Sequence, residues 1–333
     1  MISVVIPVFN ERDSLPALYA EIAGVARSAQ LDLEIFLVDD GSTDGSWQVI
    51  AEMARQYAEV HGIRLRRNFG KAAALSAGFR AARGESIFTL DADLQDDPAE
   101  IPRFQAMLGD AKTGERLDVV SGWKRVRHDP WHKVWPSRVF NLAVSWTTGV
   151  HLHDHNCGMK CYRAEVFREV RLYGELHRFI PVLAAARGFR VGELEINHRP
   201  RRFGHSKYGV RRFVKGFLDL LTVKFLTGFG QRPQHLLGSL GLICFLLGSL
   251  GLLYLGITWV IRLGYPDAFL PLHQRPLLIY ALAALLLGAQ MISIGLLAEL
   301  VTGYLGREED RYSIAETTPP TKTADYRVTH DPG

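Results

Sequence analysis

The chain is 333 residues long, and its 39 Lys and Arg residues against 35 Asp and Glu residues give a formal net charge of +4. Apolar residues make up 47% of it and charged residues 22%. These ordinary globular values exclude an intrinsically disordered, a collagen-like or a disulfide-rich chain. The three cysteines lack the two-residue spacing of redox or zinc pairs, which indicates reduced thiols.

The N-terminal part of the chain alternates between apolar runs of strand length and amphipathic patterns of helix length. Strands that alternate with helices form parallel βαβ units, so we expect a doubly wound, mostly parallel α/β sheet. Such sheets bind their ligands beyond the carboxyl ends of the strands. The predicted strands are Ile2–Val8, Leu33–Val38, Gly62–Leu65, Ser86–Leu90 and Asp118–Ser121, and the predicted helices are Ser14–Ala29, Ser46–Tyr57, Lys71–Arg83 and Ala99–Leu108.

A polar motif follows each of the first four predicted strands. Taken alone, each motif is typical of a turn or of a helix N-terminus. Four of them at one edge of a sheet indicate a ligand site instead. The motifs are Pro7 with Asn10 and Glu11, DDGSTD from Asp39, RNFGK from Arg67 and DADLQ from Asp91.

The residue types in these motifs favour a nucleotide diphosphate as the ligand. No G-x-G-x-x-G follows the first strand and no G-x-x-x-x-G-K-[ST] occurs, which disfavours a dinucleotide site and a P-loop. Asp39 or Asp40 could bond a base and its ribose. The side-chain oxygens of Asp91, Asp93 and Gln95 are hard ligands suited to Mg²⁺ or Mn²⁺. A cation with so few protein ligands completes its shell with substrate phosphates.

A basic segment precedes the apolar C-terminal part of the chain. Residues 199–232 contain nine Lys and Arg residues against one acid. Within this segment, residues 211–232 predict an amphipathic helix with Phe217, Leu220 and Leu221 on its apolar face. A basic and aromatic helix beside a membrane span is typical of an anionic membrane surface. The alternative is a helix packed on the core of the protein itself.

Two long apolar runs, Leu236–Ile261 and Leu277–Ala298, can each span a bilayer core of about 30 Å. A turn rich in proline joins them, so we predict a two-helix transmembrane hairpin over residues 235–306. The basic residues before the first span place both ends of the chain in the cytoplasm. The chain begins directly with a strand, so no signal peptide is expected. Residues 307–333 are charged and rich in Pro and Thr, and we expect them to be disordered.

The ordered motifs VVIPVFNE, VDDGSTD, NFGKAAALSAGF and LDADLQDDP, within residues 2–122, resemble the family 2 glycosyltransferases of GT-A fold. DHNCGMK from Asp154 and RFGHSKYG from Arg202 resemble the polyprenyl-phosphate glycosyltransferase branch of that family. This branch contains dolichol-phosphate mannose synthases and bacterial polyprenyl-phosphate glucosyltransferases, some with a C-terminal membrane hairpin. The resemblance implies a GT-A catalytic domain over residues 1–210 and a protein of the bacterial inner membrane.

The resemblance also implies roles for individual residues. Relatives tend to have arginine where this chain has Lys124 and Lys133, and lysine lacks the bidentate fork of arginine. The implied nucleotide-binding residues are Pro7, Glu11, Asp39, Asp40, Lys71 and Asp91; the metal ligands are Asp91, Asp93 and Gln95; the acceptor-phosphate residues are Lys124, Lys133 and Ser137; and the catalytic residues are Asp93, Asp154, Arg202 and Lys207.

The implied reaction is a metal-dependent, inverting transfer of a hexose from a UDP-sugar or GDP-mannose to undecaprenyl or dolichyl phosphate. A metal held at Asp93 would stabilise the leaving diphosphate. The acceptor phosphate is largely ionised near neutral pH, because its second pKa is about 6. Asp154 would therefore either position or deprotonate it. Arg202 and Lys207 would close over the diphosphate, or would instead attract anionic lipid.

The expected partners are the nucleotide sugar, the polyprenyl phosphate and membrane lipid, but no nucleic acid. Gly238, Gly241 and Gly248 could pack against a second copy, since relatives include tetramers. One alternative is a membrane-bound polysaccharide synthase, but the Q-x-x-R-W motif expected of it does not occur. The other is an inactive membrane adaptor, which would not need the carboxylates of Asp91, Asp93 and Asp154.

Overall fold

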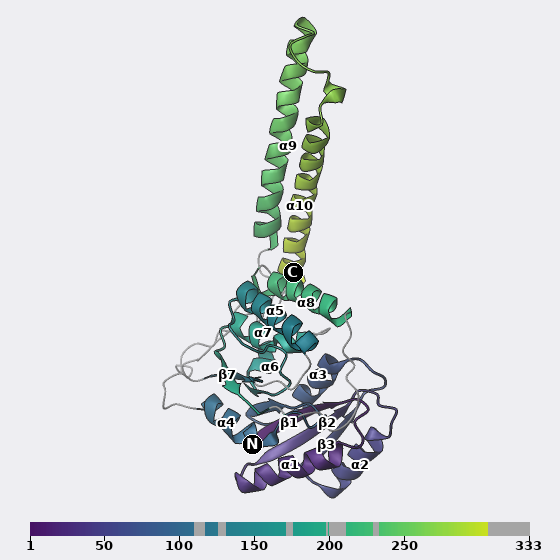
Figure 1. Cartoon of the computed structure of the whole chain (residues 1–333), viewed down its shortest axis with the longest axis vertical. Helices are drawn as coiled ribbons and strands as arrows, with labels where there is room; N and C mark the ends of the chain where they lie inside the picture. Colours follow the sequence, from purple (N-terminus) through teal and green to yellow (C-terminus); the bar gives the residue numbers. More distant parts are fainter. Residues whose placement is uncertain are drawn as a thin grey trace, which may run out of the picture.

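The computed structural model describes residues 1–109, 117–125, 131–170, 176–197, 199, 211–228 and 233–305. An α/β part lies at one end, and two long antiparallel helices extend away from it at the other (Figure 1). The expectation of disorder over residues 307–333 lies outside the described residues.

The α/β part contains a seven-stranded sheet with the strand order β3-β2-β1-β4-β6-β5-β7. Neighbouring strands are parallel except β6, which runs antiparallel to β4 and β5. All five predicted strands are present, so the predicted α/β class is confirmed. The strands are β1 Ile2–Val8, β2 Leu33–Asp39, β3 Val60–Arg64, β4 Ser86–Thr89, β5 Val119–Trp123, β6 Lys160–Arg163 and β7 Val191–Glu195.

Helices cover both faces of the sheet, and this explains why its central strands β1 and β4 are mostly apolar. In β1, Val4 and Ile6 face a core shared with α1, α2 and α4, whereas Val5 faces α3 and α7 on the other side. Side chains alternate between the faces of a strand, so both sets are buried. The helices are α1 Leu15–Ser28, α2 Ser46–Gln56, α3 Lys71–Ala81, α4 Ile101–Gly109, α5 Trp131–Thr148, α6 Val166–Glu169 and α7 Ile180–Ala186, with 3₁₀ turns η1 Pro98–Glu100 and η2 Leu176–Phe179.

Two helices, α5 and α8 (Arg211–Gly228), form the end of the α/β part that faces the hairpin (Figure 1). Leu220 and Val223 of α8 pack into a small core with Phe140 and Val144 of α5. The Lys224 ammonium of α8 also donates a 2.6 Å hydrogen bond to a carbonyl oxygen near the C-terminal end of α5, where cations are favoured. Leu220 of the predicted apolar face therefore packs on the core, as in the alternative, whereas Phe217 and Leu221 are exposed.

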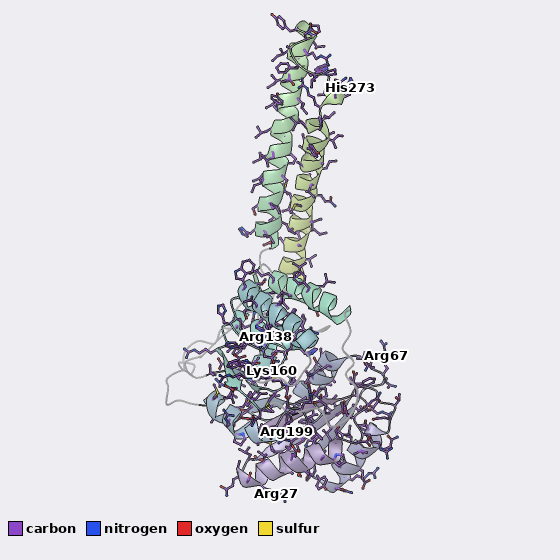
Figure 2. The ribbon with its side chains drawn as sticks, in the orientation of Figure 1. Arg27, Arg67, Arg138, Lys160, Arg199 and His273 are labelled. Atoms are coloured by element: carbon purple, nitrogen blue, oxygen red, sulfur yellow. The ribbon has the colours of Figure 1, made fainter. Side chains whose placement is uncertain are left out.

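The hairpin consists of α9 Pro233–Gly264, the 3₁₀ turn η3 Leu272–Gln274 and α10 Leu277–Leu305. Both helices have the length and composition of membrane spans, and only a small part of each is buried. A core helix of a water-soluble protein would be mostly buried. The exposed leucine and isoleucine side chains along the hairpin instead form the kind of surface that lipid covers. His273 lies at the end of the hairpin far from the α/β part (Figure 2).

Glycines let α9 and α10 approach closely. A Cβ on Gly248 would lie 2.5 Å from the backbone nitrogen of Leu285, and one on Gly241 would lie 2.9 Å from the carbonyl oxygen of Gly288. A Cβ on Gly238 would meet a side chain of its own helix. Gly241 and Gly248 therefore pack against α10 of the same chain, and contact with a second copy stays a prediction.

Candidate active site

The polar loops that follow β1 and β2 are joined by hydrogen bonds at the carboxyl edge of the sheet. Asn10, at a φ of 56°, accepts the backbone N–H of Thr43 at 2.9 Å, and its own N–H donates to Ser42 Oγ at 2.9 Å. The N–H of Glu11 donates to Ser46 Oγ at 3.0 Å. Glu11 and Pro7 are half-buried there. Hydrogen bonds therefore join the loops of the first two predicted motifs into one continuous wall at this edge of the sheet.

Asp39 and Asp40 have different surroundings although they are adjacent in sequence. Asp39 is fully buried, where its Oδ1 accepts the N–H of Ser42 at 3.0 Å and Arg64 lies 3.5 Å from its Oδ2. Asp40 accepts backbone N–H groups at 2.7 and 2.9 Å from the loop before α3. Burial raises the pKa of Asp40, while these N–H groups favour its charge. Asp39 thus supports the loop, and Asp40 joins it to the third motif.

At Gly41, the backbone of the second motif approaches the backbone of the third motif closely. Its φ is +73°, and a Cβ there would lie 2.5 Å from the backbone of Arg67. Only glycine avoids both the strain and the overlap. Arg67 itself stacks over the ring of Phe69 at 4.5 Å, and it lies at the rim of the α/β part (Figure 2).

The fourth motif is shaped by Leu94, which has a φ of 61° and a side chain buried in the core. This left-handed turn lies between Asp93 and Gln95, and the N–H of Gln95 donates to Asp93 Oδ1 at 3.2 Å. Asp91 precedes the turn, and its carboxylate contacts the Lys71 ammonium. Burial opposes the ionisation of Asp91, but the attraction of Lys71 outweighs it, so the pKa of Asp91 is lowered to about 2.

The donor set of this motif fits a magnesium or manganese ion. Two carboxylates and an amide oxygen are hard ligands. Gly158 packs closely against one of them, so that a Cβ there would lie 2.5 Å from Asp91 Oδ2. Within the described residues, no group of three or more His, Cys, Asp or Glu side chains is arranged to hold a metal. The completion of the cation's shell by substrate oxygens stays a prediction.

The predicted acceptor-side residues lie across the sheet from the first two motifs. Lys124 follows β5 and is ion-paired at 2.6 Å with the buried carboxylate of Asp96. Burial opposes the charge of Lys124, but Asp96 raises its pKa above the ordinary value. Ser137 is half-buried on α5. Lys133 is also on α5, but its side chain lies outside the described residues, as do Arg202 and Lys207.

Asp154 lies in a buried loop that polar contacts attach to β7 and α5. Its Oδ1 accepts the N–H of Asn156 at 3.1 Å, and its N–H donates to Glu193 of β7 at 3.1 Å. From α5, the Asn141 amide donates to a carbonyl oxygen of this loop at 2.8 Å, and Ser145 bonds to the His155 ring at 3.1 Å. Burial lowers the pKa of His155 to about 4, so its ring is neutral.

Two titratable residues that the sequence did not predict lie near Asp91. Lys160 begins β6, is buried in the α/β part (Figure 2), and donates to the carbonyl oxygens of His155 and Cys157. Burial and the repulsion of Lys71 lower its pKa. Burial and Lys71 also lower the pKa of His177 well below its ordinary value. Lys160 is the last residue of the DHNCGMK motif, so the sequence contains a signal for it, whereas His177 belongs to no motif.

Arg199 attaches the chain that leaves β7 to the fourth motif. Its N–H donates to the Gln95 carbonyl oxygen at 2.9 Å, and its guanidinium forms 2.7 Å ion pairs with Glu21 and Asp97. Figure 2 shows Arg199 within the α/β part, below Lys160. Arg199 is therefore fixed beside the candidate metal ligands.

This sheet with its polar loops at the carboxyl edge is a GT-A fold, the fold of a class of glycosyltransferases, and sequence comparison agrees. Residues 3–171 match the model of Glycosyl transferase family 2. The chain therefore belongs to glycosyltransferase family 2 and is a glycosyltransferase. Glucosyl-3-phosphoglycerate synthase from Mycobacterium tuberculosis, solved with Mn²⁺, UDP-glucose and phosphoglyceric acid, has the same fold, with a TM-score of 0.52 at 17% identity over 68% of this chain and 79% of that one.

Relatives of similar length are enzymes that act on polyprenyl phosphates. Dodecaprenyl-phosphate galacturonate synthase from Rhizobium johnstonii is 40% identical over 92% of this chain and 89% of its own length. Undecaprenyl-phosphate 4-deoxy-4-formamido-L-arabinose transferase from Pseudomonas fluorescens is 37% identical over 92% of this chain and 84% of its own length. The matched region includes the hairpin as well as the α/β part, and the predicted resemblance to this branch is confirmed.

Proposed function

We propose that this glycosyltransferase transfers a sugar from a nucleotide diphosphate sugar to a polyprenyl phosphate at the cytoplasmic face of a membrane, with inversion. One observation carries the proposal. The α/β part, whose edge site contains the carboxylates of Asp91 and Asp93, is attached to a hairpin with the exposed apolar surface of membrane-spanning helices. The names of the relatives support the acceptor class. These names also extend the range of possible donor sugars, from the hexose expected from the sequence to a uronic acid and a formamido-arabinose.

The donor would bind at the wall formed by the first three motifs. Asp40, Pro7 and Glu11 would contact the nucleoside, and Asp39 would act through the loop that it supports. The diphosphate would extend toward Lys71 and the fourth motif. Asp91, Asp93 and Gln95 would hold Mg²⁺ or Mn²⁺, which would stabilise the charge of the leaving diphosphate.

The acceptor would approach from the side of α5 and the Asp154 loop. Because the acceptor phosphate is already ionised near neutral pH, Asp154 mainly needs to orient it, and Glu193 and Asn141 fix the loop that carries Asp154. Lys124, Lys133 and Ser137 would bind the phosphate. Arg202 and Lys207 would add charge over the two phosphate groups from the segment that starts at Arg199.

Two helices supply a surface for the membrane beside this site. Trp146 of α5 is 86% exposed and Leu142 is 71% exposed, on helices that lie next to the hairpin (Figure 1). We place this surface at the lipid headgroups, so that the acceptor head can reach the site while its tail stays in hydrocarbon. The basic residues before α9 put the α/β part and both ends of the chain on the cytoplasmic side. The exposed apolar residues are Val139, Leu142 and Trp146 on α5 and Phe217, Leu218 and Leu221 on α8.

Reconstitution tests this function. The full chain in lipid nanodiscs, with undecaprenyl phosphate, Mg²⁺ or Mn²⁺ and labelled nucleotide sugars, should convert one donor into a labelled lipid. The donors should include UDP-linked neutral hexoses, GDP-mannose, and nucleotide-linked galacturonate and formamido-arabinose. Asp93→Ala should reduce transfer by about 100-fold or more, whereas Asp32→Asn, on an exposed aspartate, should not. Transfer that survives both chelation and Asp93→Ala would contradict the metal assignment.

A further inference from the structure

We propose that Lys71 makes cation binding at Asp91 conditional on the donor diphosphate, because the ammonium and the cation compete for one carboxylate. The inference rests on the proposed function, since it takes Asp91 as a metal ligand and a diphosphate as part of the donor. It concerns the order and coupling of binding, which neither the sequence motifs nor the relatives define.

The competition follows from the contact between the two side chains. The Lys71 ammonium is hydrogen-bonded to Asp91 Oδ1. Their side chains are 30% and 34% exposed, so the pair is open to exchange and not locked in the core. A lysine ammonium is a compact charge on a flexible stem of four carbons. It can therefore leave one anion for another without movement of α3, of which Lys71 is the first residue.

Gly158 packs against the same carboxylate. It lies so close that a Cβ on it would be 2.5 Å from Oδ2, 2.7 Å from Cγ and 2.9 Å from Oδ1. The Thr89 hydroxyl holds this glycine by donating to its carbonyl oxygen at 2.8 Å. Gly158 therefore restricts the space around the carboxylate, and a cation that binds Oδ1 must share or replace the position of the Lys71 ammonium.

The charges around the site make that replacement unfavourable without a second anion. Three lysines, Lys71, Lys124 and Lys160, lie close enough to Asp91 to act on it electrostatically. Lys124 is itself ion-paired with Asp96, so Lys71, in direct contact with Asp91, is the lysine that most directly offsets the attraction that Asp91 and Asp93 would exert on a divalent cation. A diphosphate changes the balance because it gives Lys71 a new anionic partner and gives the cation additional oxygen ligands.

The consequence is a positive coupling that must be reciprocal. If the nucleotide tightens cation binding by some factor, the cation tightens nucleotide binding by the same factor. Lys71→Met removes the competing charge, so the cation should bind well without nucleotide and the coupling should shrink. Lys71→Arg keeps the charge and should keep the coupling.

Manganese binding measures this without any turnover. The full chain in nanodiscs is titrated with Mn²⁺ and the free aquo ion is followed by electron paramagnetic resonance, without nucleotide and with UDP or GDP. The Mn²⁺–nucleotide complex that forms without protein is measured and subtracted. We expect Lys71→Met to tighten nucleotide-free Mn²⁺ binding about tenfold and to reduce the effect of nucleotide by a similar factor, within the usual range for coupled sites.

Two control variants distinguish the outcomes. Arg80→Met removes one charge from the exposed end of the same helix and should leave the Mn²⁺ affinity as in the unmodified chain. Asp91→Asn should abolish binding. If Asp91→Asn loses Mn²⁺ but Lys71→Met binds it no more tightly than the unmodified chain, this inference is overturned and the metal site stands. If Asp91→Asn still binds Mn²⁺ normally, the metal site of the proposed function fails and this inference with it.

Discussion

The proposed donor half of the site, formed by the loops after β1 to β4, differs in construction from the proposed acceptor half, formed by the Asp154 loop with α5 and α8. The donor half is held by side chains that bond neighbouring loops, such as Asn10 to Thr43 and Asp40 to the loop before α3. The acceptor half depends on Asn141 and Ser145 of a helix whose other face is apolar and exposed. Donor chemistry is therefore internal to the α/β part, whereas acceptor geometry is tied to the membrane side.

The largest effect expected from this comparison is on the chemical step at Asp154. Asp154→Asn should lower kcat by about 100-fold and leave nucleotide affinity unchanged, because Asp154 belongs to the acceptor half. Asp40→Asn should do the reverse and weaken nucleotide binding first. Steady-state kinetics with both substrates, together with nucleotide titration, would separate them. A matched loss of nucleotide affinity in Asp154→Asn would show that the two halves are not independent.

The next effect concerns the exposed face of α5. Leu142→Asp combined with Trp146→Asp should lower kcat/KM for polyprenyl phosphate in nanodiscs by about 30-fold, or about 2 kcal/mol. In the proposed placement the exposed Leu142 and Trp146 side chains contact lipid, and the aspartates that replace them would not. Nucleotide binding should be unaffected. Asp substitutions at the exposed Arg27 and Gln30, far from the hairpin, serve as the control. Full activity of the α5 variant would contradict the placement.

A smaller effect is expected where the two halves touch. Gly158→Ala should push the Asp91 carboxylate out of place, because the new Cβ would overlap it. Mn²⁺ affinity in the presence of nucleotide should fall by about tenfold, as it does when groups around metal ligands are altered. Gly24→Ala on α1, where a Cβ meets nothing within 4 Å, should leave it unchanged. Unchanged Mn²⁺ affinity in Gly158→Ala would show that the contact between Gly158 and Asp91 does not affect metal binding.

The smallest effect at neutral pH belongs to His155. Its pKa falls from 6.5 unfolded to about 4 folded, because burial disfavours the charged ring. The unfolded chain then binds more protons between these values, so stability is full above pH 6.5 and falls as the pH drops toward 4. The loss should be on the order of 2 kcal/mol. Thermal unfolding across pH 4 to 7 should show it, and His155→Gln should flatten the slope; an unchanged slope would exclude His155 as its source.

The parallel strands of the fold could be predicted because burial on both faces makes β1, β2 and β4 mostly apolar. The antiparallel β6 was missed because it has four residues and begins with Lys160. The edge strand β7 was missed because it is only half-buried and carries Glu193 and Glu195. Pairing across the sheet, and not local pattern, defines these two strands.

The site was predictable to the level of its motifs but not of its individual contacts. DADLQ and DDGSTD indicate carboxylates at strand ends. However, the burial of Asp39 under Asp40 depends on Arg64 and Ser42, which the fold brings together. The contact of Lys71 with Asp91 joins the start of α3 to the end of β4, and no spacing rule links these positions. The exposed apolar face of α5 was not predicted, because Val139, Leu142 and Trp146 belong to none of the motifs.

The position of α5 has a mechanical consequence. In the proposed placement this single helix contacts lipid through Trp146, and it contacts the Asp154 loop through Asn141 and Ser145. A tilt imposed by bilayer curvature or lateral pressure would then reach Asp154 without a hinge, and we expect the enzyme to respond to the state of its bilayer. Its turnover number should change with the acyl-chain composition of the nanodisc even when the acceptor concentration is constant.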